Sequence, residues 1–146
     1  MRATVADGVL RVSGPDRWLA TGPGGGYRTA PAAYNISVPE GFDRTDLDTY
    51  VAERRERAGF ERAGPALLTG VDLVHARGAR ADPVTVVATA GLSNPAALPM
   101  EPARASGDDT EGATPDREIG TVNLLVGTSR ALDRGALATL LATAVE

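Results

Sequence analysis

The chain has 146 residues, a net charge of −4 and 42% hydrophobic residues, which predicts one domain with an aliphatic core. It contains no cysteine and a single histidine, which excludes disulfides, thiolate catalysis and iron–sulfur clusters and makes a protein-held zinc ion improbable. A mildly acidic chain without a basic stripe is a poor candidate for binding nucleic acid, and the lack of a membrane span or signal peptide predicts a soluble cytoplasmic protein.

The first 40 residues contain short apolar runs separated by turn residues. Asp7-Gly8 lies between two weakly alternating runs and predicts a β-hairpin over residues 2–12. Further strands are predicted over residues 17–21 and 34–38. Between them, residues 22–26 form a glycine-rich loop in which the backbone can approach a neighbouring group closely.

Two amphipathic patterns predict helices. The first helix is expected over residues 46–58, with Thr45 as its N-cap and Gly59 as its stop. The second follows Asp133, which serves as its N-cap, and carries leucines at helical spacing from about Arg134 to the end of the chain.

The remaining apolar runs predict strands over residues 66–69, 71–75, 84–90 and 119–126. Residues 95–117 are rich in proline, glycine and aspartate, and are expected to form a mobile surface loop, either a lid over a site or a tolerated insertion. The element order has too many strands for regular βαβ winding. We therefore expect a single α+β domain over residues 1–146, with a mixed or antiparallel sheet on which a mid-chain and a C-terminal helix pack.

Two blocks combine a glycine, a hydroxyl and a carboxamide within or directly after an apolar strand: Gly91-Leu92-Ser93-Asn94 and Gly120-Thr121-Val122-Asn123. A polar group buried without partners costs about 1–3 kcal/mol, so polar residues at such positions suggest a prepared site. The alternatives are an ordinary turn leaving the sheet for the first block and a half-solvated edge strand for the second.

Other candidates are weaker. Gly24-Gly25-Gly26 lacks the spacing of a P-loop or a dinucleotide-binding loop and is better explained as a tight turn. His75 could pair with a serine, but a lone strand histidine is more often structural. Asp72 and Asp108 are the remaining acid or base candidates, although most aspartates in polar segments are solvated or cap a turn.

Together these blocks resemble the adenosylcobinamide amidohydrolase family (CbiZ). Its members carry Thr-Ala-Gly-Leu-Ser-Asn, a variable loop ending near Gly-Asp, then Gly-Thr-Ile-Asn, and a C-terminal helix rich in alanine and threonine. The matching segments here are Thr89 to Asn94, Gly107-Asp108, Gly120 to Val126 and Ala142 to Glu146, with Asn35, Val38-Pro39 and Leu68 to Val71 upstream and a glycine cluster at 24–26.

The resemblance implies hydrolysis of the amide that joins the aminopropanol arm to the corrin ring of adenosylcobinamide, giving adenosylcobyric acid and aminopropanol in corrinoid salvage. The cobalt belongs to the substrate, so no protein cofactor or metal is expected, and a homo-oligomer is possible. The family has a lysine after the glutamate at which this chain stops. A non-catalytic corrinoid-binding or regulatory domain is therefore kept as the alternative.

Amide hydrolysis needs a nucleophile, a proton for the departing amine and groups that hold the oxyanion. Either a hydroxyl attacks, or a carboxylate such as Asp108, Asp72 or Glu146 activates water. The candidate catalytic residues are Ser93, Asn94, Asp108, Thr121 and Asn123, and the candidate substrate contacts are Gly25, Gly26, Asn35, Thr69, Gly91 and Gly120.

Overall fold

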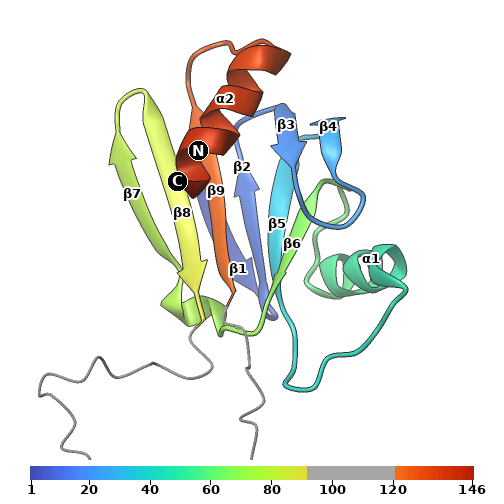
Figure 1. Cartoon of the computed structure of the whole chain (residues 1–146). Helices are drawn as coiled ribbons and strands as arrows, with labels where there is room; N and C mark the ends of the chain where they lie inside the picture. Colours follow the sequence, from blue (N-terminus) through green and yellow to red (C-terminus); the bar gives the residue numbers. More distant parts are fainter. Residues whose placement is uncertain (92–120) are drawn as a thin grey trace, which may run out of the picture.

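The computed structural model describes residues 1–91 and 121–146, and the expected α+β architecture is confirmed in it (Figure 1). The predicted loop over residues 95–117 lies outside the described residues. The strands are β1 (Arg2–Ala6), β2 (Val9–Ser13), β3 (Arg17–Ala20), β4 (Gly26–Thr29), β5 (Ala32–Ser37), β6 (Ala66–Thr69), β7 (Arg77–Ala81), β8 (Val84–Ala90) and β9 (Val122–Thr128); the helices are α1 (Leu47–Arg57), the 3-10 turn η1 (Leu73–His75) and α2 (Arg134–Val145).

The first sheet has the strand order β1-β2-β5-β6. Its hairpin turns at Asp7 and Gly8, whose φ angles of 43° and 67° are those of the tight turn that favours such a pair. β5 and β6 are parallel, and the connection between them carries α1 onto one face of the sheet. Against that face, an apolar cluster forms around Val9, Ile36 and Tyr50.

The second sheet has the order β7-β8-β9 and packs on the opposite face of the first sheet. Leu10 and Val12 from β2 meet Val87 from β8 and Leu125 from β9 in the cluster between the sheets. The β8–β9 register places Val87 opposite Leu125 and Thr89 opposite Asn123. Because side chains alternate along a strand, the polar pair lies on the same inward face as the apolar pair.

Alternation along β5 divides its side chains between the two cores. Residues 32 to 36 are all buried. Ala32, Tyr34 and Ile36 belong to the cluster on the α1 side, and Ala33 belongs to the cluster between the sheets. Asn35 shares the face of Ala33 and therefore lies between the sheets.

Both α-helices lie where the sequence predicts them, and one of the two predicted caps is confirmed. Asp133 Oδ1 accepts from the Ala136 N–H at 2.8 Å at the start of α2. At α1 the N-cap residue is Asp46 rather than Thr45, and no side chain bonds to the first turn. Gly59 ends α1 with a φ of 79°, as predicted.

The strand predicted over residues 71–75 is wrong, because the local polar groups fold this segment into the turn η1. Asp72 Oδ1 accepts from the Val74 N–H at 3.0 Å and starts the turn. β4 and β7 were not predicted, since both are short and mostly exposed and lack an apolar run. Each forms by pairing with the strand next to it in sequence.

Candidate functional site

A buried polar network lies at the end of the molecule where β5, β6 and β8 stop and β9 begins (Figure 1). Asn123 Nδ2 donates to Asn35 Oδ1 at 2.9 Å and to the carbonyl oxygen of Leu68 at 2.8 Å. Asn35 Nδ2 donates to Thr89 Oγ1 at 2.9 Å. Asn35 and Thr89 are fully buried and Asn123 is 7% exposed, so the network joins the two sheets out of contact with bulk water.

The direction of these hydrogen bonds follows from the Leu68 carbonyl, which can only accept. The Asn123 atom beside it must therefore be the amide nitrogen. The same nitrogen faces Asn35, so the Asn35 atom opposite must be the oxygen, and the Asn35 nitrogen then faces Thr89. One backbone carbonyl thus fixes the orientation of both carboxamides.

Asn123 and Thr89 both keep hydrogen-bonding capacity beyond the bonds of the network. Both hydrogens of Asn123 Nδ2 are used, so Asn123 offers a new partner only its Oδ1 acceptor. The Thr89 hydroxyl accepts from Asn35, and its own hydrogen has no acceptor among the described residues.

The strand ends around the network are closely packed. The N–H of Gly91 donates to the carbonyl oxygen of Thr121 at 2.9 Å, which brings the two glycine-containing blocks side by side. A Cβ on Gly91 would lie 2.5 Å from Val71 Cγ2, so an alanine at this position would have to displace the Val71 side chain. Thr69 is also buried, and its Oγ1 accepts from the Val71 N–H at 3.2 Å.

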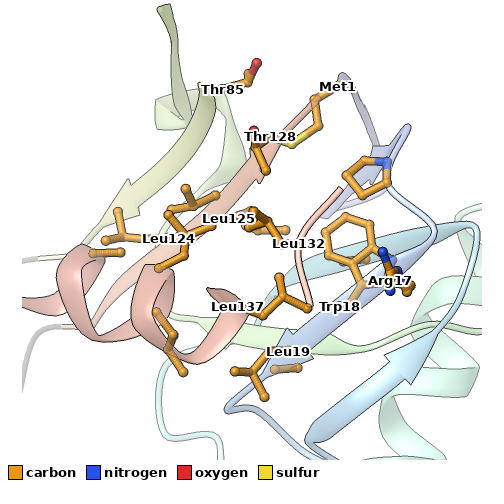
Figure 2. A pocket seen from close by; sticks show the side chains of 18 of the residues that line it. Met1, Arg17, Trp18, Leu19, Thr85, Leu124, Leu125, Thr128, Leu132 and Leu137 are labelled. Carbon is orange, nitrogen blue, oxygen red and sulfur yellow. The ribbon is translucent and has the colours of Figure 1, made fainter. Parts of the chain in front are cut away.

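A cavity of about 640 Å³ begins at Asn123 and runs along β9. Figure 2 shows that its walls are largely apolar, with Leu124 from β9, Leu137 from α2 and Trp18 from β3 directed toward one another. Thr85, Thr128 and Arg17 add polar groups. The described part of the chain therefore offers a hydrophobic space that ends at the polar network.

The structure brings together some of the predicted site residues and not others. Asn35, Thr69, Gly91 and Asn123 gather at the strand ends, with the backbone of the exposed Thr121 beside them. Gly25 lies in the turn between β3 and β4 and Gly26 is the first residue of β4, so both belong to the β3–β4 hairpin and not to the strand ends that carry the network (Figure 1). A Cβ on Gly25 would lie 2.6 Å from the carbonyl oxygen of Ala20, which explains this glycine by the turn itself. The candidates Ser93, Asn94, Asp108 and Gly120 lie outside the described residues.

Two members of the network were missing from the predicted site: Thr89 and the Leu68 carbonyl. Thr89 could have been found from the register, because alternation puts it on the inward face with Val87. The Leu68 carbonyl has no signal in the sequence, since it depends on which edge of β6 stays unpaired.

Among the residues that the structure describes, neither the histidine nor the candidate acid Asp72 joins the network. His75 and Asp72 are exposed in and beside η1. Within residues 1–91 and 121–146 there is no group of three His, Asp or Glu side chains that could hold a metal ion. In the same ranges no helix is long and apolar enough to cross a membrane. At the start of α1, away from the network, the hydrogen bond from Arg44 lowers the pKa of Asp46.

Comparison with known proteins gives one family. The family model described as adenosylcobinamide amidohydrolase matches residues 6–146. The chain is 49% identical over 146 aligned residues to the adenosylcobinamide amidohydrolase of Halobacterium salinarum, covering 98% of this chain and 62% of that protein. It is 29% identical over 94 residues to the protein of the same name from Methanosarcina mazei, covering 64% of this chain and 47% of that protein. No solved structure matches the chain significantly.

Proposed function

Because this chain belongs to the adenosylcobinamide amidohydrolase family, we propose that it hydrolyses the amide bond between the aminopropanol arm and the corrin ring of adenosylcobinamide. The products are adenosylcobyric acid and aminopropanol, as in corrinoid salvage. The observation that carries the proposal is the family match, which spans residues 6–146 and so includes the whole polar network. The chain spans about three fifths of the length of the Halobacterium salinarum protein. That this shorter chain has the activity named for the longer protein is therefore a proposal.

In this proposal Asn123 accepts a hydrogen bond through Oδ1, because its two amide hydrogens are already donated to Asn35 and Leu68. The N–H of the substrate amide, or the attacking water, is the partner that suits this acceptor. The tetrahedral oxyanion then needs other donors, and backbone N–H groups or Asn94 are the candidates. Asn35 and Thr89 are buried behind Asn123 and act as positioning residues.

The attack itself can follow two routes with the same products. A hydroxyl, from Ser93 or Thr121, adds to the carbonyl carbon, the amine leaves with a proton, and water then hydrolyses the ester. Alternatively, a carboxylate such as Asp108 takes a proton from water, which adds directly. Both routes place the scissile carbonyl beside the strand ends where Gly91 bonds to Thr121.

Mass spectrometry of adenosylcobinamide incubated with the protein tests the activity. The wild type should release aminopropanol, and Asn123→Ala should release it on the order of 100-fold more slowly. Thr4→Val is the control, since Thr4 is an exposed residue of β1 that belongs to neither the network nor the cavity lining, and this variant should stay near the wild-type rate. Tight binding of adenosylcobinamide without any product would favour the non-catalytic alternative and refute the hydrolase proposal.

No protein-held metal is proposed, because the cobalt enters with the substrate. Activity should therefore survive dialysis against EDTA. A reproducible loss that zinc restores would contradict this part of the proposal.

A further inference from the structure

β9 is the edge strand of its sheet in the described part of the chain. One backbone hydrogen bond at each end of β9 shows which of its residues bond to β8 and which face the free edge. The Gly91 N–H donates to the Thr121 carbonyl at 2.9 Å, and the Ser129 N–H donates to the Pro83 carbonyl at 3.1 Å. In an antiparallel pair, alternate residues direct both backbone groups to the partner strand. The odd-numbered residues of β9 therefore bond to β8, and Leu124 and Val126 direct their N–H and C=O groups to the opposite edge.

That opposite edge is not closed by another strand of the described chain. Among residues 1–91 and 121–146, β9 pairs only with β8, and its link to β6 is the side-chain bond from Asn123 to Leu68. The cavity runs along the same edge and is lined by Leu124 and Val126, with residues of β3 and α2 on its other sides (Figure 2). The backbone donors and acceptors of these two residues therefore border ligand space.

The chemistry of the edge and that of the walls differ. Leu19, Leu137 and Leu140 make the walls apolar, so they suit a hydrophobic body. The edge offers N–H donors and C=O acceptors that are costly to leave unpaired away from water. A ligand carboxamide supplies one acceptor and N–H donors, which is the complement of such an edge.

We propose that the outward edge of β9, at Leu124 and Val126, binds the peripheral carboxamides of the corrinoid, while the leucines of α2 contact its macrocycle. This inference rests on the proposed function and deepens it, because it places the substrate along β9 with the scissile amide at Asn123. The edge binds through backbone N–H and C=O groups, which every residue except proline offers. Comparing the side chains of related sequences would therefore not identify this binding site.

Proline at position 126 tests the inference because it removes an N–H that the β8–β9 ladder does not use. Val126→Ala is the matched control, since it removes the side chain and keeps the N–H. The ligand is adenosylcobyric acid, which retains the corrin ring and has no scissile arm. Binding is followed by quenching of Trp18, the sole tryptophan, which lines the cavity.

We expect the ligand to quench Trp18 and the Kd of Val126→Pro to exceed that of Val126→Ala about three- to tenfold, the effect of about one hydrogen bond. Equal Kd values for the two variants, or wild-type hydrolysis with no quenching of Trp18, would overturn the inference and leave the proposed function standing. A wild type that neither binds the ligand nor releases aminopropanol would overturn both.

If Val126→Pro lacks a cooperative thermal transition, a variant on α2 replaces it. Ala144→Phe narrows the cavity, whereas Ala142→Phe adds the same ring on an exposed position of the helix that does not line it. The Kd should rise at least tenfold for Ala144→Phe relative to Ala142→Phe. Equal Kd values for these two variants would overturn the inference.

Discussion

The two faces of the β1-β2-β5-β6 sheet are built on different chemistry, although the same strands supply both. The face toward α1 is closed by aliphatic and aromatic side chains such as Val9, Ile36 and Tyr50. The face toward the second sheet begins in the same manner with Leu10 and Val12, but near the end of β5 it becomes polar at Asn35.

The difference separates what holds the fold together from what makes the site. Buried apolar groups stabilise a protein without needing a particular orientation, and a buried carboxamide contributes little net stability even when it is fully bonded. Asn35 and Ile36 are neighbours with no exposed surface, yet only Asn35 must find its partners on another sheet. We infer that the α1 face supplies stability and the polar end of the other face supplies geometry.

The largest change is expected on the α1 face. Ile36→Ala should lower the free energy of unfolding by about 2–5 kcal/mol, because it deletes buried methyl groups and leaves a cavity. Urea unfolding measures this, and Val5→Ala, at a strand position that is 49% exposed, should change it by less than about 0.5 kcal/mol. Aminopropanol release well below the unfolding transition should stay within about twofold of the wild type. A large loss of activity in folded Ile36→Ala would remove the distinction between the faces.

On the opposite face, Asn35→Leu should cost about 1–3 kcal/mol, because it deprives the Asn123 Nδ2 donor and the Thr89 Oγ1 acceptor of a buried partner. Adding Asn123→Leu and Thr89→Val in the same chain removes these two polar groups as well. The triple variant should recover at least half of the lost stability and have no activity. If the triple variant has a lower free energy of unfolding than Asn35→Leu, the network itself contributes to the stability of the fold, and the distinction between the two faces is wrong.

A comparable effect is expected where the strand ends pack. Gly91→Ala should lower the free energy of unfolding by about 1–3 kcal/mol, because the new methyl group would meet Val71 Cγ2 at 2.5 Å. Combining it with Val71→Ala opens the space, so the double variant should be more stable than the sum of the two single changes predicts. Strict additivity in thermal unfolding would show that the two residues are not in contact.

The smallest effect concerns the start of α1, where the hydrogen bond from Arg44 lowers the pKa of Asp46 below its unfolded value of 3.8. A carboxyl group with a lowered pKa stabilises the folded state above its unfolded pKa, and that contribution is lost as the pH falls through the folded value. The stability difference between wild type and Asp46→Asn should therefore shrink below about pH 4. A difference that stays constant from pH 6 to pH 3 would contradict the assignment.

Local patterns in the sequence were sufficient to predict the elements that have strong internal signals. The hairpin at Asp7-Gly8, β6, β8 and the cap of α2 at Asp133 were predicted because turn residues or apolar periodicity mark them. β4 and β7 form only because a neighbouring strand offers hydrogen bonds, so their own residues carry little signal.

The site divides in the same way. The sequence pointed to Asn123 because it is a carboxamide at a strand position where apolar residues are usual, and to Asn35 only through the family resemblance. It could not show that they bond to each other, since they are 88 residues apart and on different sheets. The roles assigned to Ser93, Asn94, Asp108 and Gly120 stay predictions.

The attachment of α2 has a consequence for motion. None of the twelve residues of this helix, all of them described, is fully buried, and its main neighbour is the short strand β3. Backbone amides exchange their hydrogens with solvent through local opening, whose free energy falls with the area of contact that must be broken. The amides of α2 should therefore exchange far sooner than those of the buried β5. A bulky ligand would then reach the cavity when α2 transiently detaches from β3, while the β-strands stay paired in their sheets.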